Sequence, residues 1–186
     1  DAAILYRSNA QSRVLESAML RAEIPYRIYG GQRFYERSEI KNALSYLRLI
    51  SNKDDDLAFE RVVNLPTRGI GARTQSTVRQ IARQRNCSLW SASSIAIGSH
   101  ELSSRASNAL AKFLRLISAM TTEVEELTLI EKTETIIQRS GLLDFYKGEK
   151  GEKGMVRVEN LEELVSACGS FEPEDANLSP LTQFLD

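Results

Sequence analysis

The clearest chemical signal in this sequence is a basic segment from Arg61 to Arg85, which holds six arginines and no aspartate or glutamate. A Gly69-Ile70-Gly71 turn lies within it and is expected to open a helix. Such turns expose backbone N–H groups, and a helix N-terminus has partial positive charge, so both suit an anionic phosphate. The pattern therefore predicts contact with a nucleic-acid backbone. A solvated arginine face on a helix hairpin explains it equally well.

A few other side chains have types and positions that suit phosphate binding. Thr67 and Thr74 have hydroxyls that either reach a phosphate or cap a helix. Arg7, Asn9 and Arg33 each follow a predicted strand at its C-terminal end, where open α/β sheets bind ligands. On the residues alone, helix capping and surface solvation explain these last three better than ligand binding.

The sequence lacks the signatures of an independent enzyme. It contains no Gly-x-x-x-x-Gly-Lys-Ser/Thr phosphate loop, no Gly-x-Ser-x-Gly nucleophile turn and no His-Glu-x-x-His zinc motif. One histidine and two separated cysteines predict neither a metal site nor a disulfide, and they favour a reducing, cytoplasmic compartment. The sequence has no run of about 18 apolar residues, so no membrane span is predicted. We therefore predict no catalytic residue, metal or cofactor in this chain.

The elements that must position these residues fall into two parts. Ala2–Tyr6 and Tyr26–Tyr29 are predicted strands, and Val14–Ala22 between them has apolar residues at helical spacing. A strand–helix–strand fragment of this kind needs more strands than the chain supplies. After Gly31 the pattern is helical throughout. The predicted helices cover residues 38–50, 57–63, 104–120, 129–137 and 158–167, and two further predicted helices contain residues 78–82 and 89–90. The predicted fold is mainly α, preceded by a short α/β fragment.

The helices on either side of the Gly69-Ile70-Gly71 turn predict a helix-hairpin unit. Pro66 ends the first of them. Gly141 is a predicted C-cap for a later helix, and Gly148–Gly154 is a predicted flexible charged loop. The basic segment is therefore expected on the hairpin, within the helical part of the chain.

Four stretches resemble, in the same order, the UvrD, Rep and PcrA group of superfamily 1A DNA helicases. Ala3–Arg13 is similar to a motif in the later part of their domain 2A, and Tyr26–Ile40 to the segment that joins domain 2A to domain 2B. Leu65–Gly71 resembles their Gly-Ile-Gly motif in 2B, and Glu149–Leu164 a later stretch of 2B. The resemblance covers nearly the whole chain, and four motifs in order make it highly specific.

The resemblance implies that the parent protein is an ATP-dependent 3′–5′ DNA helicase of mismatch and nucleotide-excision repair. ATP and magnesium would bind between its two motor domains, whose nucleotide-binding motifs are absent here. Residues 1–33 are therefore expected to be a fragment of motor domain 2A, and residues 34–186 accessory domain 2B. We expect no catalysis by the fragment alone. Domain 2B of the family swivels, and the resemblance places the hinge near Gly30–Tyr35.

The same resemblance implies roles for individual residues. Single-strand contacts of the family match Arg7, Asn9 and Arg33. Duplex contacts match Thr67, Arg68, Gly69, Ile70 and Gly71, to which we add Arg73 from the basic segment. The expected partners are DNA at a junction of single strand and duplex, the remaining helicase domains and repair proteins, with no membrane.

An alternative function is a protein-docking module that binds repair partners or a second helicase protomer. The feature that favours it is the acidic C-terminal stretch, which has seven acidic residues and no lysine or arginine from Glu159 onward. Substituting Arg68 and Arg73 in the parent enzyme separates the two hypotheses. Loss of unwinding with retained single-strand ATPase activity indicates duplex contact, whereas intact unwinding with lost partner stimulation indicates docking.

Overall fold

The computed structural model describes residues 2–7, 11–28, 33–99 and 101–185. In these ranges the chain is mainly helical and contains no strand, which confirms the mainly α part of the predicted fold class but not the preceding α/β fragment. The helices are α1 (Ser12–Arg21), η2 (Phe34–Glu36, a 3₁₀ turn), α2 (Ser38–Ser51), α3 (Asp56–Val62), α4 (Ala72–Arg85), α5 (Leu89–Gly98), α6 (Ser104–Glu123), α7 (Leu129–Arg139), α8 (Leu142–Lys147), α9 (Glu152–Gly169) and α10 (Pro180–Leu185).

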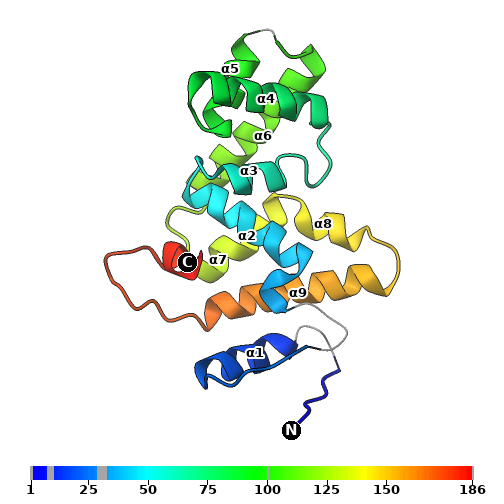
Figure 1. Cartoon of the computed structure of the whole chain (residues 1–186), viewed down its shortest axis with the longest axis vertical. Helices are drawn as coiled ribbons and strands as arrows, with labels where there is room; N and C mark the ends of the chain where they lie inside the picture. The colour runs from blue at the N-terminus through cyan, green and yellow to red at the C-terminus, as the bar shows by residue number, and fades with distance from the viewer. Residues whose placement is uncertain (1, 8–10, 29–32, 100, 186) are drawn as a thin grey trace.

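Helix α2 lies at the centre of the molecule and packs against α3, α6, α7, α9 and α10 (Figure 1). Its side chains Ile40, Ala43, Tyr46 and Leu47 are completely buried. They recur every three or four residues, so they fall on one face of the helix. A helix with neighbours on several sides buries more than one stripe, and Leu49 on α2 is accordingly buried as well.

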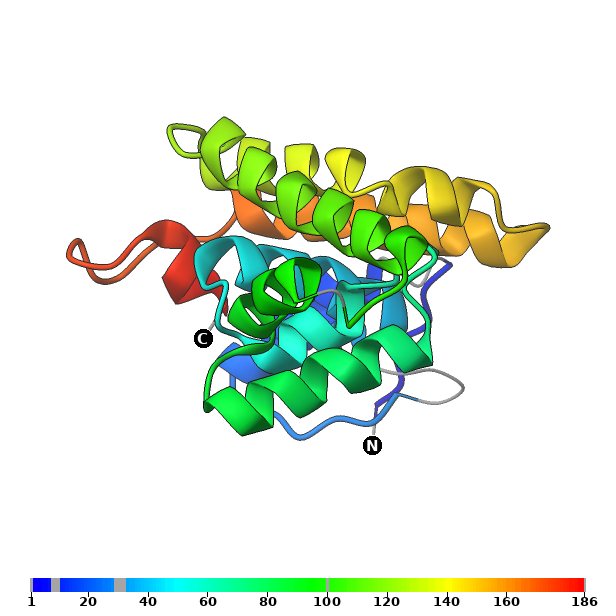
Figure 2. The ribbon, with the colours of Figure 1, turned by 90° about the horizontal axis from the view of Figure 1, so that it is seen from above.

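The other helices surround α2 on two sides. Viewed along the long axis, α6 to α9 lie along one side of the molecule, and α3 to α5 lie on the other (Figure 2). The rings of Phe59 on α3 and Phe113 on α6 meet edge to face, with centroids 5.6 Å apart. Helices α4 and α5 form one end of the molecule, and α1 lies at the opposite end (Figure 1).

Side-chain caps fix the start of several helices. Asp55 accepts a hydrogen bond from the Ala58 N–H at 2.9 Å at the start of α3. Ser88 and Ser103 cap α5 and α6 in the same manner. Thr128 and Glu131 form a reciprocal capping box at α7. These residues satisfy N–H groups that lack a partner inside the helix.

The N-terminal part differs from the prediction. The predicted strands Ala2–Tyr6 and Tyr26–Tyr29 are not strands in the residues that the structure describes, and Tyr29 itself lies outside them. A strand is held by hydrogen bonds to a neighbouring strand, and no described segment supplies such a neighbour. The helix between them is present as α1.

Two boundaries in the C-terminal half also differ. The predicted C-cap Gly141 lies one residue after Ser140, the C-cap of α7, and with a positive φ of 81° it is also the N-cap of α8, a short helix that periodicity did not predict. The predicted loop Gly148–Gly154 is shorter, because α9 begins at Glu152. No helix in the described part of the chain has the length and apolar character needed to cross a membrane.

Candidate nucleic-acid interface

Residues 63–71 form the loop of the predicted hairpin, and Asn64 organises it from within. The side-chain oxygen of Asn64 accepts hydrogen bonds from the backbone N–H groups of Arg68 at 2.9 Å and Ile70 at 3.1 Å. The Ile70 side chain is completely buried and anchors the loop in the core. Gly69 has a φ of 79°, in the left-handed region that favours glycine. Gly69 therefore lets the chain reverse direction between the backbone held by Asn64 and the buried Ile70 side chain.

Arg68 points into the protein from this loop. Its guanidinium donates hydrogen bonds to the carbonyl oxygens of Pro66 at 2.9 Å and Ser140 at 2.7 Å. It also lies over the rings of Tyr46 and Phe113, 5.8 and 5.5 Å from their centroids. These contacts use much of the hydrogen-bonding capacity of the guanidinium group and place its charge against aromatic rings. In this structure Arg68 supports the loop from behind.

Tyr46 supports the same loop from α2. Its hydroxyl donates a hydrogen bond to the Leu65 carbonyl oxygen. The side chain is completely buried, and burial raises the pKa of Tyr46 to about 12. The phenol is therefore neutral near pH 7 and able to donate. Together with Arg68, it fixes the backbone carbonyls that lead into the Gly69–Gly71 turn.

The first turn of α4 is open to an anion. Gly71 is the N-cap, and no side chain caps the helix. No acidic residue lies in this turn, whereas the neighbouring helix α3 begins with Asp55 and Asp56. The residues Gly71, Ala72 and Arg73 are exposed. Backbone N–H groups at an uncapped helix N-terminus, beside a cationic side chain, form an arrangement that binds phosphate.

One face of α4 extends this arrangement. Arg73, Ser76, Gln80 and Arg83 are exposed and recur at helical spacing, with no acid among them. Neither arginine forms an ion pair with a described residue. Arg79 differs, because its guanidinium pairs with Glu60 of α3. Arg73 and Arg83 are ten residues apart, about 15 Å along the helix axis.

The structure separates the predicted duplex residues by exposure. Thr67, Gly69, Gly71 and Arg73 are exposed, whereas Ile70 is buried and Arg68 is partly buried. Thr74, whose hydroxyl was a candidate phosphate ligand or cap, is buried. The exposed members lie in the turn and at the start of α4.

The structure describes two of the three predicted single-strand residues. Arg7 is exposed, and its backbone N–H donates to the side chain of Gln11 at 3.0 Å. Arg33 is exposed, with its guanidinium 5.4 Å from the centroid of the Tyr26 ring. No hydrogen bond, ion pair or ring contact joins these two arginines in the described part of the chain. Asn9 lies outside the described residues.

No group of three or more histidine, cysteine, aspartate or glutamate side chains among the described residues is placed to hold a metal ion. A cavity of about 10 Å³ lies behind the loop, lined mainly by apolar residues that include Phe59, Ile70 and Val78. That volume holds about one water molecule, far less than a nucleotide.

Sequence reasoning did not predict the residues that hold the loop. Asn64 was not singled out, although an asparagine at the end of a helix commonly accepts from backbone N–H groups a few residues on. Tyr46 lies in the core, and helical spacing alone does not indicate its hydrogen bond to the Leu65 carbonyl oxygen. The Ser140 carbonyl is a long-range partner of Arg68, and no local sequence pattern indicates it.

Comparison with known proteins defines the class of this chain. The family model of the UvrD-like helicase C-terminal domain matches residues 1–186, so the chain belongs to that family.

The similarity of the chain to individual proteins agrees with this family assignment. The chain is 56% identical to DNA helicase II of Escherichia coli (strain K12) over 187 residues, which cover 100% of this chain and 26% of that protein. It is 54% identical to DNA helicase II of Haemophilus influenzae, again over 100% of this chain and 26% of that protein. It is 41% identical to the ATP-dependent DNA helicase PcrA of Bacillus subtilis, over 92% of this chain and 23% of that protein. The chain thus spans about a quarter of the length of these relatives.

Proposed function

We propose that this chain is a DNA-contacting accessory segment of an ATP-dependent 3′–5′ DNA helicase that acts in DNA repair in the cytoplasm. Residues 1–33 would belong to motor domain 2A and residues 34–186 to accessory domain 2B. Family membership supports the parent activity, and the buried core that begins at Phe34 supports this boundary. The other helicase domains and repair proteins are its proposed partners.

The observation on which the DNA contact rests is the open first turn of α4. Exposed backbone N–H groups at Gly71 and Ala72, the Arg73 side chain and the Thr67 hydroxyl would meet phosphates of a duplex. Gly69 and Ile70 set the turn, and Arg68 holds it in place. Arg83 would meet the same duplex farther along, because 15 Å corresponds to about four base pairs.

Contacts to phosphates position a duplex without reading its bases. The segment would therefore hold duplex DNA of any sequence ahead of the motor and so regulate unwinding. Arg7, Asn9 and Arg33 are proposed to meet the single strand when the rest of domain 2A is present. ATP and magnesium would bind in the motor domains of the parent helicase. No catalytic step is assigned to this chain.

The test is duplex binding by this chain as a function of salt, measured by fluorescence anisotropy on a blunt duplex. Removing one arginine that neutralises a phosphate should reduce the slope of log K against log[salt] by about 0.9. We expect Arg73→Gln to lower that slope by this amount, and Arg73→Gln with Arg83→Gln by about twice as much. Arg21→Gln, the same change on exposed α1 at the opposite end, should leave the slope unaltered.

Two outcomes would contradict this proposal. Unchanged slopes in both the single and the double variant would remove α4 from the interface. An equal reduction by Arg21→Gln would mean that binding depends on total charge and not on this surface. If α4 variants also leave unwinding by the parent enzyme intact while partner stimulation disappears, the docking function is favoured.

A further inference from the structure

Helix α1 buries two polar side chains against the rest of the protein and leaves two of its large apolar side chains mostly exposed. Ser12 and Glu16 are its buried residues, only 1% and 8% exposed. Val14 and Leu20 are 58% and 63% exposed. Within the described ranges, no hydrophobic side chain before Phe34 belongs to the core cluster or packs against it. Burial of apolar surface is what normally holds a helix in a domain, so α1 must be held differently.

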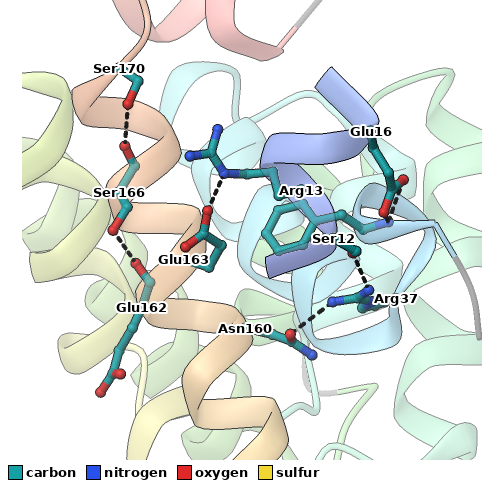
Figure 3. Close-up of polar contacts among 10 residues, drawn as sticks. Ser12, Arg13, Glu16, Arg37, Asn160, Glu162, Glu163, Ser166 and Ser170 are labelled. Atoms are coloured by element: carbon teal, nitrogen blue, oxygen red, sulfur yellow. Dashed lines mark hydrogen bonds and ion pairs between the residues drawn. The ribbon is translucent and has the colours of Figure 1, made fainter. Parts of the chain in front are cut away.

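Polar contacts hold it, and their partners are a residue of α9, a residue of η2 and Arg37 between η2 and α2 (Figure 3). Arg13 forms an ion pair with Glu163 of α9, with both side chains largely buried. Ser12 accepts a hydrogen bond from the guanidinium of Arg37 at 2.7 Å. The carboxylate of Glu16 accepts from the backbone N–H of Phe34, at 3.2 Å to either oxygen.

The partners of α1 on the helical body are fixed independently of α1. Phe34 is completely buried in the core. Arg37 also donates to the side-chain oxygen of Asn160 at 2.9 Å, and Asn160 donates to Glu39 at 2.6 Å. Glu163 lies on α9, whose Leu161 and Leu164 are core residues. The body therefore keeps a preformed polar surface whether α1 is bound to it or not.

Separation of α1 exposes groups that water can satisfy. A hydrogen bond that is exchanged for one to water contributes little net stability, whereas buried apolar surface has no such substitute. We propose that Ser12, Arg13 and Glu16, with Phe34, Arg37 and Glu163, form a salt-sensitive polar latch that releases α1 without unfolding the helical body. The latch does not depend on the proposed DNA contact, because it involves none of the α4 residues.

Amide hydrogen exchange of the full chain, followed residue by residue by NMR, tests the latch. We expect Arg13→Gln and Glu163→Gln each to speed exchange of the α1 amides by roughly fivefold, with α2 and α9 amides unchanged. Raising the salt from about 0.05 M to about 0.5 M should have the same selective effect in the unsubstituted chain. The exchanged pair Arg13→Glu with Glu163→Arg should restore α1 protection.

A matched control is Arg139→Gln, which removes the exposed ion pair of Arg139 with Glu123 at 3.0 Å between α7 and α6. It should leave exchange in α1 at the rate of the unsubstituted chain. The proposal is overturned if α1 keeps its protection in both single variants and at high salt. It is also overturned if α2 and α9 amides speed up together with α1, since α1 would then be an integral part of the folded body. Failure of the exchanged pair to restore protection would exclude the ion pair as the latch.

Discussion

Arg68 and Arg73 lie five positions apart in one basic segment, and their side chains have different environments. Arg68 donates to the carbonyls of Pro66 and Ser140, whereas Arg73 is exposed without an ion-pair partner among the described residues. A guanidinium that is hydrogen-bonded and stacked on aromatic rings contributes to folding. An exposed guanidinium contributes mainly to the electrostatic field outside the protein. The same residue type therefore has two roles.

We expect Arg68→Gln to lower the free energy of unfolding by about 2 kcal/mol, because it removes two charge-assisted hydrogen bonds to carbonyls. Arg73→Gln should change it by less than about 0.5 kcal/mol, as is usual for an exposed site. Urea unfolding followed by circular dichroism measures both. If the two variants are equally stable, the inward contacts of Arg68 do not support the loop in solution.

The raised pKa of Tyr46 predicts that the folded chain loses stability at alkaline pH. Its pKa is about 12 in the folded chain, against a usual value of about 10. Below pH 10 the Tyr46 hydroxyl keeps its proton in both the folded and the unfolded chain, so Tyr46 makes its full contribution to the free energy of unfolding. Above pH 10 the unfolded state loses its proton first, and the effect disappears as the pH rises to about 12. Unfolding free energy should fall by roughly 2 to 3 kcal/mol over this range.

The matched variant for this titration is Tyr46→Phe, which keeps the ring and removes the hydroxyl. Burial also raises the pKa of Tyr35 and Tyr146, so some alkaline dependence will persist in the variant. The prediction concerns the difference between the two proteins in urea unfolding from about pH 9 to about pH 12. Parallel pH profiles would show that Tyr46 does not titrate in this range.

At the scale of elements, the junction between α8 and α9 depends on Gly154. A Cβ at this position would lie 2.5 Å from the Glu149 carbonyl oxygen and 2.8 Å from that of Tyr146. Both atoms belong to the backbone, so Gly154→Ala must displace one helix from the other, at a cost of roughly 1–3 kcal/mol. Arg157 of α9, which pairs with Glu149 at 2.5 Å, would move as well. Thermal unfolding measures the effect.

Gly98 provides the comparison for this prediction, since a Cβ there meets no atom within 4 Å. It is the last residue of α5, and alanine has the higher helix propensity. We therefore expect Gly98→Ala to leave the melting temperature unchanged or raise it slightly. A Gly154→Ala protein as stable as the unsubstituted chain would mean that α8 and α9 adjust to each other freely.

Most helices of this fold could be predicted, because long amphipathic segments such as α2 and α6 repeat their apolar residues with helical spacing. Helix α8 was missed because six residues are too few to show a period. The two predicted strands were wrong within the described residues, because an apolar run cannot show whether a neighbouring strand is present. The exposed Gly71 and Arg73 could be chosen from sequence, but the inward direction of Arg68 depends on Ser140, 72 residues away.

At the scale of the whole molecule, two parts are held by different forces. The helical body from Phe34 to α10 shares one apolar core, and α1 is attached to it by hydrogen bonds and an ion pair. The proposed duplex surface lies on the body, toward the end opposite α1 (Figure 1). A change in the position of α1 therefore need not disturb the loop before α4, because none of the contacts that hold this loop includes α1.

This division predicts how the chain responds to shortening at either end. Deletion of residues 1–33 should leave cooperative unfolding intact, with a similar midpoint, because no described hydrophobic residue before Phe34 contributes to the core. Deletion of α10 should destabilise the body by roughly 2–5 kcal/mol or more, because Leu181 and Leu185 are buried in the core. Circular dichroism during urea unfolding distinguishes the two deletions. Loss of cooperative unfolding on removal of residues 1–33 would show that α1 and its polar contacts are required for the helical body to fold.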